Sequence, residues 1–147
     1  MATIQLPADF KEFLKLLNSS NVEYLVIGDY AVNYYGFSRT TGDLDVWIAI
    51  SPDNAKRVAQ ALHDFGFPQA DAAEFQRPRL VVRMGIPPLR LEILTSISGV
   101  EFADCYARRL EAELGGITVN FIRLDDLKRN KRASGRLKDQ LDLEQLP

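Results

Sequence analysis

Two acidic residues stand where carboxylates are costly unless they have a partner. Asp43 and Asp45 open an apolar, β-branched segment that runs to Ile50. Residues i and i+2 of a strand point to the same face about 6.7 Å apart, so the two carboxylates would lie side by side and repel each other. A hard divalent cation such as Mg²⁺ or Mn²⁺ relieves that repulsion, and the pattern predicts a metal site. The alternative is a turn-ending Asp43 and a solvent-facing Asp45, because Asp-x-Asp is common in unrelated proteins.

A third acid lies in a comparable setting. Glu92 is flanked by apolar residues inside the strand expected from Leu89 to Leu94. A carboxylate rarely stands in the middle of a strand without a partner. Glu92 is therefore a candidate third member of the site, and Arg90, on the same face two residues earlier, is the alternative structural partner.

A glycine turn comes before the acids in the chain. Gly28 ends the apolar run 24–27 and precedes a short helix expected over 30–35. Backbone N–H groups at such a helix start can face a phosphate. The glycine motifs of P-loop and dinucleotide-binding proteins are absent from the sequence, so a nucleotide would be held in another way.

The remaining periodicities predict the elements that must position these residues. Helical patterns cover 8–17 and 52–65, and another is expected from Phe102 through Leu110 to the glycines at 115 and 116. Strands are expected over 24–27, 44–50, 80–84, 89–94 and 117–122, with 85–88 as a hairpin connection and 68–78 as a loop. After residue 122 the sequence is helical, with a break at Gly135. We expect an α+β fold in which residues 1–147 form a single domain, with a mixed sheet of about five strands flanked by helices and a helical C-terminus.

Composition excludes several function classes. The 147 residues are 46% hydrophobic and 26% charged, which suits one globular domain. The single cysteine and single histidine exclude disulfide frameworks and Cys/His zinc sites. No apolar stretch approaches the ~18 residues that span a bilayer, and the start of the chain lacks the order of a secretion signal. We therefore expect a cytoplasmic protein that does not enter a membrane.

Charge is unevenly distributed along the chain. The formal net charge is -2, yet the segment 123–138 holds seven basic residues against Asp125 and Asp126. This positive C-terminal segment predicts either contact with the phosphates of a nucleic acid such as tRNA or a solvated helical face.

Together these residues resemble the nucleotidyltransferase superfold related to DNA polymerase β, and in particular its small bacterial members of the AbiEii type and the minimal nucleotidyltransferases of toxin–antitoxin systems. The resemblance covers nearly the whole chain and follows the order of the family's motifs. The motifs read Gly28-Asp29-Tyr30-Ala31, then Tyr35-Gly36-Phe37-Ser38-Arg39-Thr40-Thr41, then Asp43-Leu44-Asp45, and a closing segment from Lys131 to Asp142.

The resemblance implies an activity and a site. The activity is Mg²⁺- or Mn²⁺-dependent transfer of a nucleoside monophosphate from a nucleoside triphosphate to an acceptor hydroxyl on a tRNA or a protein. Asp43, Asp45 and Glu92 would ligate the metal ions, which stabilise the attacking and leaving oxygens. The residues implied to bind the nucleotide are Gly28, Asp29, Arg39, Thr41, Lys131 and Lys138. A homodimer or an antitoxin partner is also implied.

Two positions depart from the family pattern. Asp29 stands where the family has Gly or Ser, which adds negative charge beside an expected polyanion, and Glu92 replaces an aspartate. Asp29 is also suited to capping a helix start. Two alternatives therefore stay open: a catalytically impaired relative that binds a nucleotide or a partner, and an enzyme that adenylylates an antibiotic.

Overall fold

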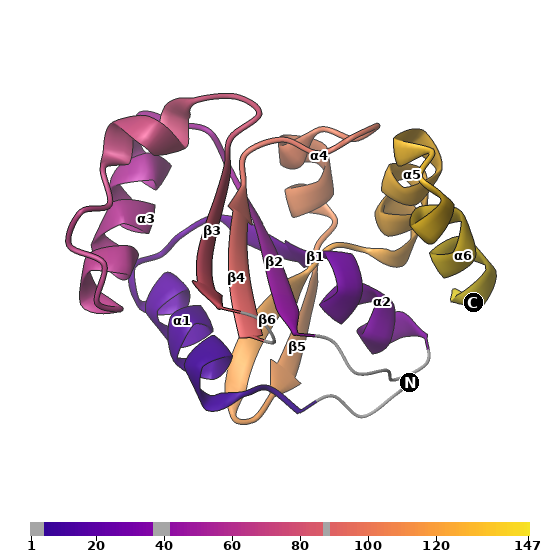
Figure 1. Ribbon diagram of the computed structural model, residues 1–147, viewed down its shortest axis with the longest axis horizontal. Coiled ribbons are helices and arrows are strands. Elements are labelled where there is room, and N and C mark those ends of the chain that lie inside the picture. Colours follow the sequence, from indigo (N-terminus) through magenta and orange to yellow (C-terminus); the bar gives the residue numbers. More distant parts are fainter. Residues whose placement is uncertain (1–4, 37–41, 87–88) are drawn as a thin grey trace.

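Six strands form one mixed sheet. The computed structural model describes residues 5–36, 42–86 and 89–147 (Figure 1). The strand order is β3-β4-β2-β1-β6-β5. The pairs β1–β2, β3–β4 and β5–β6 are antiparallel, whereas β2–β4 and β1–β6 are parallel. The strand bounds are β1 Tyr24–Ile27, β2 Asp43–Ile48, β3 Val81–Ile86, β4 Leu89–Leu94, β5 Leu110–Leu114 and β6 Ile117–Phe121.

Helices flank the sheet on both sides. In Figure 1, α1 and α3 lie on one side, and α2, α5 and α6 lie on the other. The helix bounds are α1 Ala8–Ser19, α2 Gly28–Tyr35, α3 Pro52–Asp64, α4 Phe102–Ala107, α5 Leu124–Ser134 and α6 Leu137–Gln145, with a 3₁₀ turn over Ala72–Gln76. None of the described helices has the length and apolar character that crossing a bilayer requires. The α+β class, the mixed sheet and the helical C-terminus are confirmed, with six strands in place of about five.

Several elements begin and end where local chemistry predicts. All four residues of β1 are buried, as its uninterrupted apolar sequence implies. The Ser51 hydroxyl accepts a hydrogen bond from the backbone N–H of Asn54, 3.1 Å away, and Pro52 occupies the first turn of α3. Helix α5 ends at Ser134, and the Gly135 that follows has a φ of 67°, in the left-handed region that favours glycine. These boundaries are set by single residues and are readable from the sequence.

The helix expected up to residue 114 is wrong. Helix α4 ends at Ala107, and Leu110–Leu114 is instead a strand paired with β6. Gly115 and Gly116, which lie between β5 and β6, both have positive φ and form the two-residue loop of this hairpin. Leu110 follows Phe102 and Tyr106 at helical spacing, but it also opens a segment, 110–114, in which apolar and acidic residues alternate as in a strand.

The sheet register brings the predicted acids to neighbouring strands. In the parallel pair β2–β4, Asp43 lies opposite Arg90 and Asp45 lies opposite Glu92. In the antiparallel pair β3–β4, Arg83 lies opposite Glu92. Since side chains two residues apart share a face, all five charged groups project from the same side of the sheet.

A buried ion cluster joins the last two helices. Lys131 is only 4% exposed, and its Nζ lies 2.9 Å from Asp139 Oδ1 and 3.1 Å from Asp142 Oδ2. Asp139 also accepts hydrogen bonds from the Ser134 hydroxyl and from Arg136 Nε. The angle between α5 and α6 is therefore fixed by charges that have little access to water.

Replacing Lys131 by methionine should lower the free energy of unfolding by about 3–5 kcal/mol, because it leaves buried carboxylates without their ammonium. Urea denaturation measures this change. The neighbouring Arg132 is exposed, and Arg132→Met should change stability by no more than about 0.5 kcal/mol. Equal effects of the two substitutions would contradict the assigned role of Lys131.

The same cluster predicts a pH dependence of stability. Burial alone would raise the pKa of Asp139, but hydrogen bonds from Ser134, Lys131 and Arg136 outweigh it and lower the pKa to about 2. In the unfolded chain the pKa returns to about 3.9, so the stabilisation is complete above that pH and is lost as the pH falls towards 2. Between these limits, the wild type should lose about 2 kcal/mol more stability than Asp139→Asn. Urea titrations across this range check the difference, and parallel losses in the two proteins would rule it out.

Candidate active site

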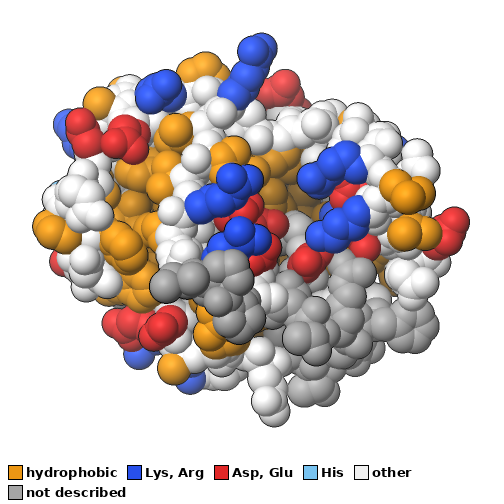
Figure 2. Space-filling view, in the orientation of Figure 1, with side chains coloured by type: hydrophobic (Ala, Val, Ile, Leu, Met, Phe, Trp, Pro, Cys, Tyr) orange, Lys and Arg blue, Asp and Glu red, His pale blue; other side chains and the backbone are white. Residues whose placement is uncertain are grey.

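A cleft of about 510 Å³ lies between the sheet and the helices α5 and α6. Figure 2 shows acidic side chains in the middle of this face, between two groups of basic side chains. The charged residues that line the cleft are Asp43, Asp45, Arg83, Glu92, Lys131, Arg136 and Lys138. The structure therefore brings the three predicted acids into one cleft, together with both predicted lysines.

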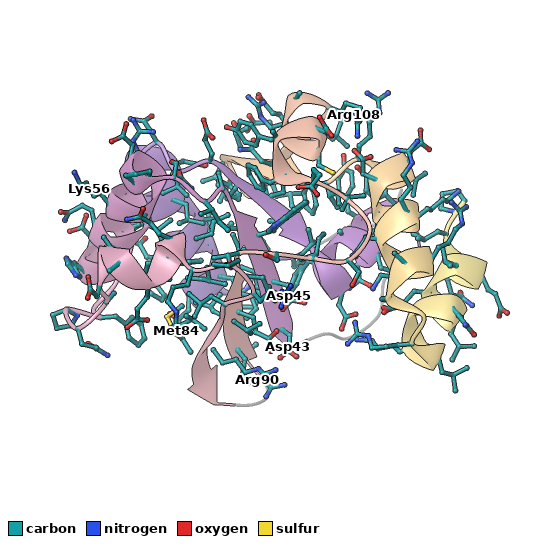
Figure 3. The ribbon with its side chains drawn as sticks, turned by 90° about the horizontal axis from the view of Figure 1, so that it is seen from above. Asp43, Asp45, Lys56, Met84, Arg90 and Arg108 are labelled. Atoms are coloured by element: carbon teal, nitrogen blue, oxygen red, sulfur yellow. The ribbon has the colours of Figure 1, made fainter. Side chains whose placement is uncertain are left out.

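Asp43 is held by an arginine. Arg90 Nε donates to Asp43 Oδ1 and Arg90 Nη2 donates to Oδ2, both at 3.1 Å. Figure 3 shows Arg90 beside Asp43 at the start of β2, with Asp45 farther along the strand. The sequence offered Arg90 as the structural partner of Glu92; in the structure its guanidinium forms a two-pronged pair with Asp43 instead.

Asp45 and Glu92 form a close carboxyl pair. Asp45 Oδ1 is buried and has no hydrogen-bond partner among the described residues. Burial, first, and then the charge and hydrogen bond of Glu92 and the charges of Asp29 and Asp43 together raise the pKa of Asp45 to about 7. Glu92 Oε1 in turn accepts a hydrogen bond from Arg83 Nε at 2.9 Å. Ionisation of Asp45 is therefore unfavourable at this position, and Asp45 does not simply face solvent.

Gly28 leaves room for Asp45. Its φ is +67°, and a Cβ built at this position would lie 2.3 Å from Asp45 Oδ2. Gly28 thus lines the cleft as expected, and the absence of a side chain is needed for the position of a carboxylate as well as for the turn into α2.

Asp29 and Lys138 pair with each other. Lys138 Nζ lies 3.0 Å from Asp29 Oδ1, and the contact links α2 to α6. The sequence singled out Asp29 as an adverse negative charge and Lys138 as a phosphate ligand. In the structure the lysine compensates the charge of the aspartate.

The structure describes one of the other three residues implied to bind a nucleotide. Lys131 lines the cleft, but Asp139 and Asp142 hold its ammonium. Arg39 and Thr41 lie outside the described residues.

The positive C-terminal segment is largely neutralised within the fold. Arg129, Lys131, Arg136 and Lys138 all form ion pairs with aspartates. Three of these aspartates, Asp29, Asp139 and Asp142, lie outside the segment. Counting charges along the chain therefore overstated the positive potential that this segment presents to a partner.

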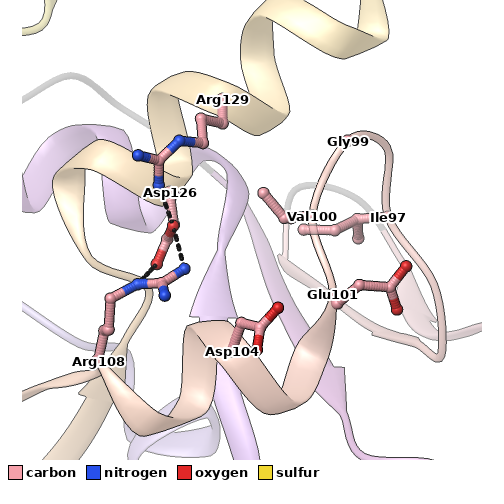
Figure 4. Close-up of a pocket in the computed structure, with 8 residues that line it drawn as sticks. All are labelled: Ile97, Gly99, Val100, Glu101, Asp104, Arg108, Asp126 and Arg129. Atoms are coloured by element: carbon pink, nitrogen blue, oxygen red, sulfur yellow. Dashed lines mark hydrogen bonds and ion pairs between the residues drawn. The ribbon is translucent and has the colours of Figure 1, made fainter.

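A second cavity, also of about 510 Å³, lies between α4, α5 and the loop 97–101 (Figure 4). Asp126, completely buried, accepts two hydrogen bonds from Arg108, at 3.1 and 2.9 Å, and one from Arg129 at 2.8 Å. Arg108 directly follows α4, and Arg129 lies on α5 together with Asp126. The cavity is thus bordered by a structural ion cluster that joins α4 to α5.

Sequence reasoning did not identify Arg83 or Arg136 as lining residues. The predicted hairpin pointed to another partner: with residues 85–88 as the connection, Arg83 would lie opposite Arg90. In the structure β3 extends to Ile86, which pairs with Leu89, and this register places Arg83 opposite Glu92. No local signal marks Arg136, whose position depends on the packing of α6 against α5.

The carboxylates of the cleft suit a hard divalent cation. Asp45 Oδ1 is buried without a hydrogen bond from any residue that the structure describes, and the missing side chain of Gly28 lets the Asp45 carboxylate lie against the backbone at the edge of the cleft. Within the described ranges, no three His, Cys, Asp or Glu side chains already stand in a metal-binding arrangement. Asp43 and Glu92 are turned towards Arg90 and Arg83 instead. Asp43, Asp45 and Glu92 are nonetheless the residues that would hold the ion.

Comparison with protein families gives a match over nearly the whole chain. No curated protein is significantly similar to the chain. The model of a family described as nucleotidyl transferase of unknown function (DUF2204) matches residues 7–146. The match confirms the resemblance to nucleotidyltransferases, while the closer likeness to AbiEii-type proteins stays a prediction. Because the match spans nearly the whole chain, this protein belongs to that nucleotidyl transferase family.

Proposed function

We propose that this protein is a Mg²⁺- or Mn²⁺-dependent nucleotidyltransferase that moves a nucleoside monophosphate from a nucleoside triphosphate to an acceptor hydroxyl. The observation that carries the proposal is the convergence of Asp43, Asp45 and Glu92 from adjacent strands in one cleft. Membership of a nucleotidyl transferase family supports the class of reaction.

In this proposal the reaction takes place at the carboxylates of Asp43, Asp45 and Glu92, which line the cleft. Divalent ions bound there would stabilise charge on the phosphoryl oxygens and lower the pKa of the acceptor hydroxyl. The only histidine of the chain, His63, contacts the carbonyl of Ala70 on the far side of the fold. A proton leaving the acceptor therefore passes to a carboxylate of the cleft or to water.

The other residues that line the cleft suit the two chemically different parts of a nucleotide, its charged phosphates and its neutral sugar and base. Gly28 and the start of α2 present backbone N–H groups next to the acids, which suits phosphate oxygens. Ser96, Ser98 and Asn130 also line the cleft with neutral polar groups. Such groups can bind a sugar, a base or an acceptor hydroxyl without adding charge.

An impaired, purely binding relative is the weaker alternative. That interpretation rested on Asp29 as an uncompensated negative charge near a polyanion. The ion pair with Lys138 removes much of that objection.

The acceptor and its biological setting belong to the proposal. A tRNA and a protein hydroxyl are both candidates, and the paired state of segment 123–138 weakens the electrostatic argument for tRNA. The toxin–antitoxin setting, a homodimer or antitoxin partner and the cytoplasmic location stay predictions from the sequence.

Asp43→Asn and Asp45→Asn should each reduce transfer of label from an α-labelled nucleoside triphosphate by at least about 100-fold, because each removes a proposed metal ligand. The assay uses Mg²⁺ or Mn²⁺ with all four nucleotides and a panel of tRNA, protein and small-alcohol acceptors. Asp104→Asn, at the second cavity, is the matched control and should retain activity. Transfer that is absent under every condition, or that survives loss of Asp45, would overturn the proposal.

Gly28→Ala should abolish most of the transfer activity. The added Cβ would overlap Asp45 Oδ2 and displace the carboxylate. Gly116, in the loop between β5 and β6, also has a positive φ, +84°, and its Cβ position has nothing within 4 Å, so Gly116→Ala carries a similar backbone cost of about 1–2 kcal/mol away from the cleft. Transfer assays and thermal melts of both variants separate strain from displacement. Equal activity in the two alanine variants would show that the room beside Asp45 is unimportant.

A further inference from the structure

Two arginines of the β3–β4 hairpin occupy the carboxylates that a metal would need. We propose that Arg83 and Arg90 are substrate-binding residues that pair with Glu92 and Asp43 in the nucleotide-free protein and transfer to the triphosphate when the metal and nucleotide bind. This inference rests on the proposed function and assigns a role to two residues that the sequence motifs leave out.

The contacts show how completely the acids are engaged. Arg90 uses both prongs of its guanidinium on both oxygens of Asp43. Arg83 Nε donates to Glu92 Oε1. A cation that takes these oxygens must displace the guanidiniums, so metal binding and arginine pairing compete at the same atoms.

Exposure makes that displacement feasible. The Arg83 side chain is 65% exposed whereas that of Glu92 is 16% exposed, and the side chains of Arg90 and Asp43 are 35% and 34% exposed. A guanidinium that leaves its carboxylate therefore stays in contact with water, and the carboxylate stays in the cleft. Exposed pairs of this kind are weak enough to exchange partners.

The released guanidiniums match the incoming ligand. Arg83 lines the cleft, and Arg90 adjoins it through Asp43. A triphosphate offers pairs of oxygens that a planar guanidinium binds in two-pronged fashion, as it does a carboxylate. The arginines thus compensate carboxylates in one state and phosphates in the other.

A permanent structural pairing makes the opposite prediction. If Arg90 only kept Asp43 in position, its loss would weaken the binding of metal and nucleotide alike. If Arg90 competes with the metal and then binds phosphate, its loss strengthens the binding of metal and weakens the binding of nucleotide. The signs of the two changes therefore decide between the roles.

The test measures both affinities by calorimetry on wild type, Arg83→Gln and Arg90→Gln. Mn²⁺ alone should bind each variant about fivefold more tightly than wild type, because the competing guanidinium is gone. The α,β-methylene analogues of the four ribonucleoside triphosphates, with Mg²⁺, should bind each variant about tenfold more weakly. Arg90→Lys, which keeps the charge without the fork, should fall between Arg90→Gln and wild type in both measurements. Arg57→Gln on the exposed face of α3 is the control and should match wild type.

The outcomes separate this inference from the proposed function. Opposite shifts for Mn²⁺ and the analogues support the exchange of partners. If wild type binds both ligands but the glutamine variants weaken both or change neither, the inference is overturned and the proposed function stands. If wild type binds neither Mn²⁺ nor any analogue, the proposed function fails, and the inference fails with it.

Discussion

The accumulation of carboxylates on two neighbouring parallel strands is the constraint on which the rest of the structure depends. Asp45 and Glu92 are register partners, so their backbones lie only about 4.8 Å apart. Asp29 and Asp43 add negative charge close by. Such a cluster opposes folding unless cations reach it, and here they arrive from three elements: Arg83 on β3, Arg90 on β4 and Lys138 on α6.

The C-terminal helices can contribute a cation only because they are themselves held by charge. Lys131 joins α5 to α6 through Asp139 and Asp142, and Arg136 and Ser134 add further bonds to Asp139. This cluster positions the start of α6 so that Lys138 reaches Asp29 on α2. The resemblance implied that Lys131 binds the nucleotide. In the structure Lys131 holds α5 and α6 together and so helps to position Lys138.

The sequence revealed the acids because their signals are local. Alternation within a strand places Asp43 beside Asp45, apolar neighbours mark Glu92, and a single glycine marks the turn at residue 28. The partners of these acids were not readable in the same way. Arg90 pairs with Asp43 and not with Glu92, and Lys138 pairs with Asp29. Both pairings depend on which strands and helices become neighbours in space.

The missed strand has a related cause. Phe102, Tyr106 and Leu110 satisfy helical spacing, and Leu110, Ala112 and Leu114 satisfy strand spacing, so the segment is ambiguous until the edge of β6 is available to pair with it. The two adjacent glycines were consistent with a helix stop and with a hairpin loop alike. Tertiary pairing, which a single sequence does not display, selected the hairpin.

The charged face of the sheet also specifies the fold. Between Arg90 and Glu92 on β4 stands Leu91, and Ile93 follows; both apolar side chains are buried. A slip of β4 by one residue against β2 would turn Arg90 and Glu92 into the apolar layer and bring Leu91 and Ile93 to the cleft. The cost of burying two charges excludes that register. A slip by two residues in either direction keeps the faces but separates Asp43 from Arg90 and so loses their two-pronged ion pair. The residues proposed to bind metal and nucleotide are therefore the same residues that select the alignment of the strands carrying them.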